Sequence, residues 1–201
     1  MLWRFLLALA IGIPAGAALS WNAVRTERSF GSVTIGSWTA WPGQGSPEAD
    51  PYLRARVAAE AIVPLGVAEG IEFEANGDAN RRPLERRCNY RLEGPMPQAR
   101  FWTLSAMDDA GRVIGAAEGQ DATAHSSSLL REPDGTAPVS LGPRPAPGNW
   151  LPVTGTGPLT LKLRLYDAAS AGDLALLEPI MPRITLVSCR PLSGTAGPAG
   201  R

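Results

Sequence analysis

The chain has 201 residues, of which 44% are hydrophobic, and its 19 basic and 19 acidic side chains give a formal net charge of zero. A chain of this size and composition can bury one globular core, and it is unlike both disordered and polytopic membrane proteins. Because its arginines are spread along the chain without a basic cluster, we expect no nucleic-acid partner.

The N-terminus carries an uncharged apolar run over residues 5–19, which Trp21 extends towards the roughly 20 residues that span a bilayer. We predict that residues 1–24 form a signal anchor and a transmembrane helix, with Trp21 at the membrane interface. Small residues at 15–17 and 16–18 leave cleavage by a signal peptidase open. The expected location is the inner membrane, crossed once, with the following domain in the periplasm.

The two cysteines, Cys88 and Cys189, lie 101 positions apart (189 minus 88). This separation is too long for a local metal-ligand motif, and an even cysteine count in an exported chain indicates a disulfide. We predict a disulfide between the middle of the fold and its last strand. Two unpaired buried thiols are the alternative.

The first elements after the apolar run are a strand and a helix. Val33 to Trp41 begins with the alternation typical of a strand. Asp50 followed by Pro51 is a helix start, and we expect the helix to run until Pro64. Its expected buried stripe comprises three residues, Leu53, Val57 and Ala61.

Short alternating segments between turns predict a β-rich domain over residues 25–190, followed by a disordered tail at 191–201. The expected strands are 71–75, 88–93, 99–107, 113–114, 159–166 and 184–189. A turn is expected at 76–78 and a solvated arginine-rich loop at 81–87. Strands without alternating helices favour an antiparallel β-sandwich or jelly-roll-like domain with one short helix.

Several segments resemble the DUF1214 family over about residues 31–190. They are Trp38-Thr39-Ala40-Trp41-Pro42, Asp50-Pro51-Tyr52-Leu53-Arg54-Ala55, Pro64-Leu65-Gly66, Ala99-Arg100-Phe101-Trp102-Thr103-Leu104, Gly148-Asn149-Trp150-Leu151-Pro152 and Leu163-Arg164-Leu165-Tyr166-Asp167. The resemblance implies a β-sandwich-like envelope domain, which occurs either behind a DUF1254 region or alone behind a membrane segment. We expect the stand-alone, membrane-anchored form. The resemblance implies no activity.

His125 is followed by three serines and is a candidate for a hydrolytic triad with Asp108, Asp109 or Asp121. The chain has no G-x-S-x-G elbow, and adjacent His and Ser residues do not by themselves place a base against a nucleophile. We therefore favour a polar loop or edge strand at this position.

Glu72 and Glu74 share one face of a strand and are candidates for acid/base work, or for calcium binding with Asp78. A solvated strand face is the simpler interpretation. One histidine and two distant cysteines are too few for a zinc site, and neither a P-loop nor a G-x-G-x-x-G motif occurs. We expect no metal and no cofactor.

The aromatic residues are the better candidates for binding, because indole rings beside amide and guanidinium donors suit a saccharide or a peptide. The predicted binding residues are Trp38, Trp41, Arg100, Trp102, Asn149, Trp150, Arg164 and Tyr166. Core packing of the tryptophans, and a turn-capping role for Asn149, are the alternatives.

These observations favour a non-catalytic binding or structural module for an envelope glycan or a membrane protein. A hydrolase acting on an envelope glycan or ester is the second hypothesis.

Overall fold

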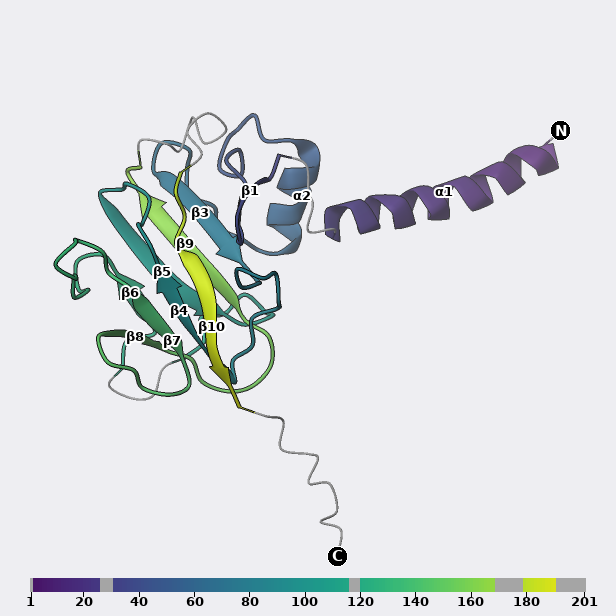
Figure 1. Cartoon of the computed structure of the whole chain (residues 1–201). Helices are drawn as coiled ribbons and strands as arrows, with labels where there is room; N and C mark the ends of the chain where they lie inside the picture. The colour runs from purple at the N-terminus through teal and green to yellow at the C-terminus, as the bar shows by residue number, and fades with distance from the viewer. Residues whose placement is uncertain (1, 26–30, 116–119, 169–178, 191–201) are drawn as a thin grey trace, which may run out of the picture.

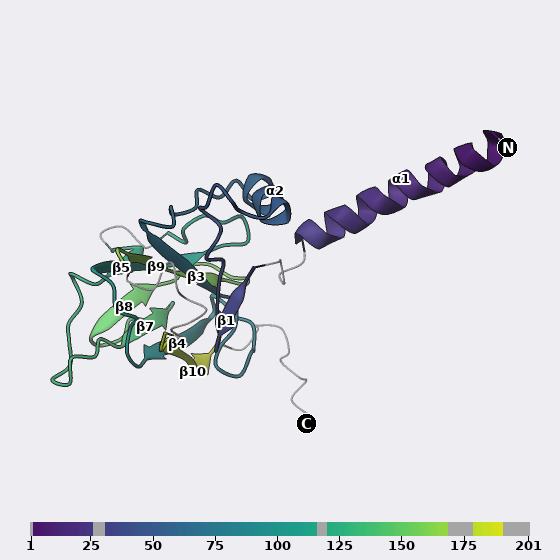
Figure 2. The same cartoon turned by 90° about the horizontal axis from the view of Figure 1, so that it is seen from above.

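A computed structural model describes residues 2–25, 31–115, 120–168 and 179–190. Within these residues the chain forms one long N-terminal helix, one short helix and ten strands in two sheets (Figures 1 and 2). The two sheets pack against each other, so the predicted mainly β, sandwich-like fold with one short helix is confirmed.

Helix α1 (Leu2–Arg25) projects away from the β-domain (Figure 1). Its Leu2–Asn22 stretch has 21 residues, a mean hydropathy of 1.8 and no buried residue. At 1.5 Å per residue this stretch is about as long as the hydrocarbon core of a bilayer is thick. Pro14 lies within the helix, a position that membrane-spanning helices tolerate. The helix thus has the length and composition of a membrane span, and a signal sequence meets the same criteria.

The larger sheet has six antiparallel strands in the order β1-β2-β3-β9-β5-β6. They are β1 (Val33–Ile35), β2 (Trp38–Ala40), β3 (Gly70–Ala75), β9 (Thr160–Tyr166), β5 (Phe101–Met107) and β6 (Thr123–His125). Strand β9 shows the predicted alternation, with Leu161, Leu163 and Leu165 completely buried. These leucines face the second sheet.

The smaller sheet has four strands in the order β10-β4-β7-β8. They are β10 (Arg183–Cys189), β4 (Cys88–Glu93), β7 (Val139–Gly142) and β8 (Asn149–Pro152). Strands β7 and β8 are parallel and the other pairs are antiparallel. The inner faces of both sheets form one core, with Phe73, Leu104 and Leu163 opposing Leu92, Leu141 and Leu151.

A disulfide joins Cys88 to Cys189, as predicted. The two residues are direct partners in the β4–β10 ladder, at the start of one strand and the end of the other. The bond therefore connects the last strand to the middle of the chain.

Two expected elements differ from the structure. The single strand predicted for 33–41 is a hairpin of β1 and β2, because Gly36 adopts a φ of +62° and turns the chain. The expected strand at 113–114 is a single bridge between Met107 and Val113. Asp108 accepts bonds from the backbone N–H groups of residues 110 and 112, which ends the pairing in a tight turn.

Helix α2 (Pro51–Ala59) begins as predicted, since Asp50 accepts a hydrogen bond of 2.8 Å from the backbone N–H of residue 52. The helix ends before Pro64 because Ala61 adopts a φ of +49°. The predicted buried stripe was wrong after Leu53: Val57 is half-buried, Ala61 is exposed, and Arg56 is the other buried residue of the helix.

The 76–87 region is only partly the solvated loop that the sequence predicts. Arg81 and Arg82 are exposed, whereas Leu84 is completely buried in the core. Asp78 is also buried, because its carboxylate accepts hydrogen bonds from the backbone N–H groups of Asn80 and Arg82 and from the Arg82 guanidinium. The predicted disordered tail, 191–201, lies outside the described residues.

Two short strands, β7 and β8, were not among the expected elements, and β6 was expected only as one of two alternatives. Strand β6 corresponds to the edge strand that was favoured around His125. Strands β7 and β8 contain Gly142 and Pro152, which weaken the strand pattern in the sequence.

The disulfide supplies a test of stability. The double variant Cys88→Ser/Cys189→Ser is expected to lose about 2–5 kcal/mol of unfolding free energy, because a loop of about 100 residues is no longer closed in the unfolded state. Urea unfolding of the two proteins, with and without a thiol reductant, measures this loss. Reductant should lower the midpoint of the natural sequence only, and an unchanged midpoint would contradict the prediction.

Candidate functional site

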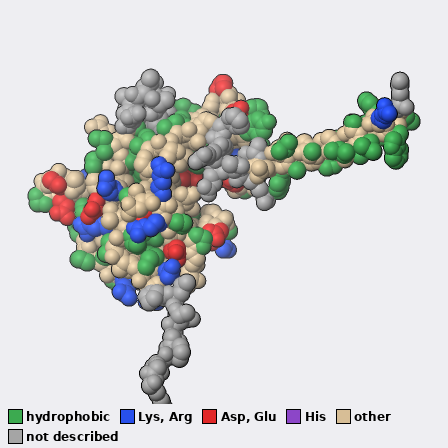
Figure 3. Space-filling model, turned by 45° about the vertical axis from the view of Figure 1, so that its right-hand side comes forward, with side chains coloured by type: hydrophobic (Ala, Val, Ile, Leu, Met, Phe, Trp, Pro, Cys, Tyr) green, Lys and Arg blue, Asp and Glu red, His purple; other side chains and the backbone are tan. Residues whose placement is uncertain are grey.

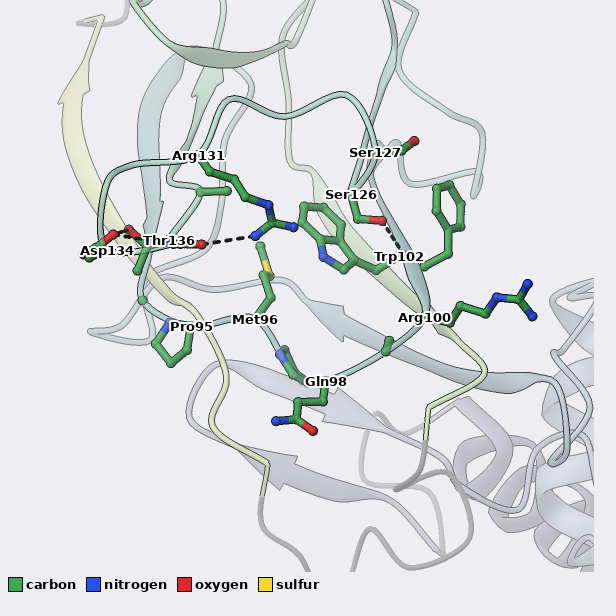
Figure 4. Close-up of a pocket in the computed structure, with 16 residues that line it drawn as sticks. Pro95, Met96, Gln98, Arg100, Trp102, Ser126, Ser127, Arg131, Asp134 and Thr136 are labelled. Atoms are coloured by element: carbon green, nitrogen blue, oxygen red, sulfur yellow. Dashed lines mark hydrogen bonds between the residues drawn. The ribbon is translucent and has the colours of Figure 1, made fainter.

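One candidate site lies at one end of the sandwich, where two connections cross between the sheets. Residues 94–100 lead from β4 to β5, and residues 126–138 lead from β6 to β7. The crossings are neighbours, because the Ser126 backbone N–H donates to the Trp102 carbonyl (3.0 Å). They enclose a half-open pocket of about 510 Å³, the end pocket (Figure 4). This volume is within the range of small-molecule sites.

Trp102 and Met96 form the apolar part of the end pocket. Trp102 belongs to the inward-facing series of β5 and is only 5% exposed, so it closes the core at this end of the sandwich. The Met96 side chain points towards the indole from the opposite connection (Figure 4). The pocket therefore has a rigid aromatic floor that is continuous with the hydrophobic core.

The polar rim of the end pocket contains several hydrogen-bond donors and one carboxylate. It includes the Arg100 and Arg131 guanidinium groups, the Gln98 amide and the Ser127 hydroxyl. Arg131 reaches across the pocket towards Trp102 and donates to the Gly135 carbonyl at 3.1 Å (Figure 4). This bond holds the long side chain in place.

Asp134 is the carboxylate of the end pocket, and its own turn engages it. One oxygen accepts hydrogen bonds from the Thr136 hydroxyl (2.7 Å) and backbone N–H (2.9 Å). The Thr136 hydroxyl and then its N–H lower the pKa of Asp134 below its ordinary value. The arrangement of the rim favours a neutral or anionic polar ligand.

Asn149 fixes one wall of the end pocket. Its Oδ1 accepts from the Leu130 backbone N–H (2.7 Å), and its Nδ2 donates to the carbonyls of Leu130 (2.8 Å) and Pro138 (3.0 Å). These three bonds tie the connection that carries Arg131 to strand β8. Asn149 satisfies backbone groups, as in the alternative drawn from the sequence, but those groups belong to residues 130 and 138.

A second polar cluster covers the outer face of the six-stranded sheet. Lys162 on β9 contacts Glu72 and Glu74 on β3, each at 2.9 Å, and Arg164 donates from Nε to Glu72. Strand register produces the pairs, since Glu72 faces Arg164 and Glu74 faces Lys162 across the ladder. Glu72 and Glu74 are half-buried rather than the fully solvated pair expected.

The charges of this cluster keep Glu72 ionised. Burial by itself raises the pKa of Glu72, but the charges and hydrogen bonds of Lys162 and Arg164 outweigh burial and leave the pKa below its ordinary value. Burial likewise opposes the raised pKa of Lys162, which the two carboxylates cause. A carboxylate held in this way does not serve as a proton donor near neutral pH.

A cleft of about 920 Å³ lies beside this cluster, between residues 59–65 and 107–111. Arg56 closes the neighbouring region: its guanidinium lies 3.7 Å from the centre of the Trp41 ring and 3.6 Å from Glu74. The buried Arg56 cation therefore covers one face of the Trp41 ring.

The structure separates the eight predicted binding residues. Arg100 and Trp102 line the end pocket, and Asn149 supports it. Trp38 is 1% exposed, and its indole N–H donates to the Pro182 carbonyl at 2.8 Å. Trp41 is buried against Arg56.

The remaining three predicted residues lie on the outer faces of the sheets. Trp150 is half-buried on β8 and donates to the Gly142 carbonyl at 3.2 Å. Arg164 belongs to the ionic cluster, and the Tyr166 ring lies 5.8 Å from that of Phe101. A ligand-binding role for any of the eight residues stays a prediction.

Sequence reasoning missed Met96, Gln98 and Arg131 in the end pocket. The prolines at positions 95 and 97 mark a loop before β5, which is a usable signal for Met96 and Gln98. Nothing near Arg131 indicates that it faces a connection 30 or more residues earlier in the chain.

Of the His, Ser and Asp triad considered from the sequence, the structure contains a contact between His125 and Ser127. The His125 Nδ1 lies 3.0 Å from the Ser127 hydroxyl. In the described part of the chain, Asp108, Asp109 and Asp121 make no hydrogen bond with His125, and Asp108 is bound to Arg112. The described residues likewise contain no group of three His, Cys, Asp or Glu side chains placed to hold a metal.

Comparison with known families gives one match. The model of a protein family of unknown function, DUF1214, matches residues 69–170, which is 102 of 201 residues. The chain belongs to the DUF1214 family. The family match predicted from the sequence is thereby confirmed.

The part of the chain that matches the DUF1214 model contains both connections around the end pocket and the whole ionic cluster of β3 and β9. Helices α1 and α2 and strand β10 lie outside it. The end pocket is therefore built from the DUF1214 portion, whereas both helices belong to the part before it.

Two solved structures are similar to this DUF1214 chain. The VPA0106 protein from Vibrio parahaemolyticus shares 19% identity, with a TM-score of 0.56 over 70% of this chain and 36% of that chain. An uncharacterised protein from Burkholderia cenocepacia shares 19% identity, with a TM-score of 0.41 over 79% of this chain and 48% of that chain. The chain spans less than half the length of either protein, and the first similarity supports the fold. A comparison with curated proteins found no match.

The ionic cluster predicts a pH-dependent contribution to stability. Because the folded-state pKa of Glu72 lies below the ordinary value of 4.5, its contribution is present above about pH 4.5 and is lost as the pH falls through the folded-state pKa. Glu72→Gln should therefore lower stability at pH 7 by about 1–3 kcal/mol and flatten its decline below pH 4.5.

Urea unfolding between pH 3 and 7 measures both effects. Glu93→Gln is the matched control, because Glu93 forms an ion pair with Arg91 on the exposed surface and should change little. Equal acid dependence in the natural sequence and Glu72→Gln would show that Glu72 makes no such contribution.

Proposed function

We propose that this DUF1214 protein is a single-pass inner-membrane protein whose β-domain faces the periplasm. Helix α1 supports the anchor, since its apolar stretch of 21 residues matches the thickness of a bilayer. The Cys88–Cys189 disulfide supports the compartment, because such bonds persist in oxidising environments such as the periplasm. Trp21 lies near the end of the apolar stretch, where an interfacial aromatic residue favours retention of the helix.

The domain binds the carbohydrate of an envelope glycan in the end pocket without cleaving it. The end pocket itself is the observation that carries this proposal: an indole floor lies beneath a rim of guanidinium, amide and hydroxyl donors. Saccharides combine apolar ring faces with hydroxyl groups, so they suit a pocket of mixed character. Loops at the end of a rigid sandwich are common sites of recognition.

The rigidity of the rim also supports binding. The three Asn149 bonds hold one connection, and the Arg131 bond to Gly135 holds the side chain that crosses the pocket. Groups that are already fixed before binding lose less conformational freedom when the ligand arrives. A loop of an envelope protein is the alternative ligand for the same donors.

The second candidate function is a hydrolase acting on an envelope glycan or ester. The contact between His125 and the Ser127 hydroxyl favours it, and Ser127 also lines the end pocket. A working nucleophile additionally needs an oriented base and an oxyanion hole. Analysis of the glycan after incubation with the protein separates the two functions.

The proposed location predicts the behaviour of the expressed full chain on fractionation. Met1 should be retained, and the protein should stay in the membrane fraction after an alkaline carbonate wash. Protease added to the periplasmic side should digest the β-domain, and mass analysis without reductant should find the peptides of Cys88 and Cys189 linked. A soluble product with a new N-terminus would show that α1 is a cleaved signal.

The proposed ligand predicts a loss of affinity when the rim is altered. Muropeptides and lipopolysaccharide core oligosaccharides, titrated into the full chain in detergent, should change its tryptophan fluorescence. Arg131→Ala should weaken binding by about 10- to 150-fold, since a hydrogen bond from a charged group contributes roughly 1.5–3 kcal/mol.

Arg144→Ala is the matched control, because Arg144 is also exposed and lies outside the end pocket. Its affinity should equal that of the natural sequence. Mass spectrometry of the glycan after incubation should find it intact, and cleavage that is lost in Ser127→Ala would assign the hydrolase instead. Equal affinities of the two arginine variants would show that the glycan does not bind in the end pocket.

A further inference from the structure

Helix α2 buries a charged residue and exposes mainly apolar or small residues, unlike an ordinary surface helix. Its two buried residues are Leu53 and Arg56. Except for Arg54, the exposed positions of the helix are apolar or small, and they are Pro51, Tyr52, Ala55, Ala58 and Ala59. A surface helix usually places its charged residues towards water and its apolar residues towards the core.

The contacts of Arg56 fix this orientation. Its Nε donates to Glu60 at 3.1 Å, its Nη2 lies 3.6 Å from Glu74, and its guanidinium covers the Trp41 ring. Rotation of α2 to bury its alanines would move the cation away from Trp41 and Glu74, which lie outside the helix. The apolar side of α2 is therefore held on the outside of the domain.

An exposed apolar residue also follows the end of α2. Val63, four residues after the helix, is 87% exposed, and Tyr52 at the start of the helix is 44% exposed. We call the exposed side chains of Pro51, Tyr52, Ala55, Ala58, Ala59 and Val63 the α2 face. Hydrophobic side chains gather on the domain close to the point where α1 meets it (Figure 3).

The α2 face lies next to the end of the apolar N-terminal helix. The C-terminal part of α1 contacts α2, and the two helices lie close together in both ribbon views (Figures 1 and 2). Six residue steps separate Arg25 from Gly31 (31 minus 25), which span at most about 22 Å. Once α1 is inserted, α2 is therefore close to the membrane surface.

We propose that the α2 face rests on the surface of the lipid bilayer into which α1 inserts. This inference depends on the proposed membrane anchoring of α1. The chemistry of the face fits the interfacial region, where tyrosine is enriched and short apolar side chains contact the acyl boundary. Arg54 is the exposed cation on the same helix, and its guanidinium suits lipid phosphates.

Contact with lipid would also remove the outward apolar side of α2 from water. Burial of Arg56 directs the other side of α2 outward, and this side faces water only when the domain is away from the membrane. A second contact besides α1 would restrict the tilt of the β-domain. The β-domain would then keep one orientation relative to the membrane.

Site-specific fluorescence in vesicles tests the inference. The full chain, with Ala59→Cys or Val63→Cys labelled by an environment-sensitive thiol probe, is reconstituted into phosphatidylcholine and phosphatidylglycerol vesicles. These vesicles contain lipids with a nitroxide near the headgroup. The native cysteines form a disulfide, so only the introduced thiol reacts. Val187→Cys on β10 is the matched control, because Val187 is 63% exposed and lies on the smaller sheet.

Probes at positions 59 and 63 should be quenched at least about threefold more strongly than the probe at 187, because the α2 face lies at the headgroup boundary. Equal quenching at the three positions, in protein that floats with the vesicles, overturns this inference and leaves the anchor intact. Failure to float overturns the anchor and the inference together. Crosslinking between two chains through position 59, without lipid quenching, assigns the face to a second copy and also overturns the inference.

Discussion

Strand β9 lies at the centre of the larger sheet, between β3 and β5, and its strict alternation determines what both faces of that sheet contain. Leu161, Leu163 and Leu165 point inward and are completely buried, so they form the middle of the core. Lys162 and Arg164 point outward and meet the carboxylates of β3. A shift of one residue in register would exchange these two sets and leave cations in the core.

The outward charges of β9 set the environment of the segment that covers them. Lys162 binds both Glu72 and Glu74, and Glu74 in turn contacts Arg56 of α2. The orientation of α2 thus follows from a chain of ion pairs that starts on the central strand. Removing one partner from such a chain leaves an uncompensated half-buried charge, which costs more than the pair contributes in isolation.

The end pocket has a different physical origin. Both connections around it pass from one sheet to the other, and the core ends there with Trp102 instead of a capping helix or strand. Hydrogen bonds from Asn149 and Arg131 give these connections a defined shape. The ends of a sandwich are suited to binding because the sheets supply rigidity while the connections vary in sequence.

Much of the fold could be predicted from local patterns. The apolar helix, the cap at Asp50, the alternation of β9 and the family segments are visible in the sequence, because each depends on neighbouring residues. The short strands β7 and β8 could not be identified in this way, since a few residues with a glycine or a proline carry little periodic signal. The helix boundary near Ala61 was wrong because a backbone reversal there precedes the proline that the sequence marks.

The candidate site depended on tertiary structure to a greater extent. The sequence grouped Arg100 and Trp102 with Trp38 and Trp41, but of these four residues only Arg100 and Trp102 line the end pocket. The expected buried stripe of α2 also left out Arg56, because the partners that bury it lie on a separate loop and strand. The sequence by itself determined the compartment signals, the β-rich class and the cysteine pair, whose causes are local or compositional. Only the tertiary structure decided which residues share the end pocket and which side of α2 faces outward, because both depend on contacts between segments far apart in the chain.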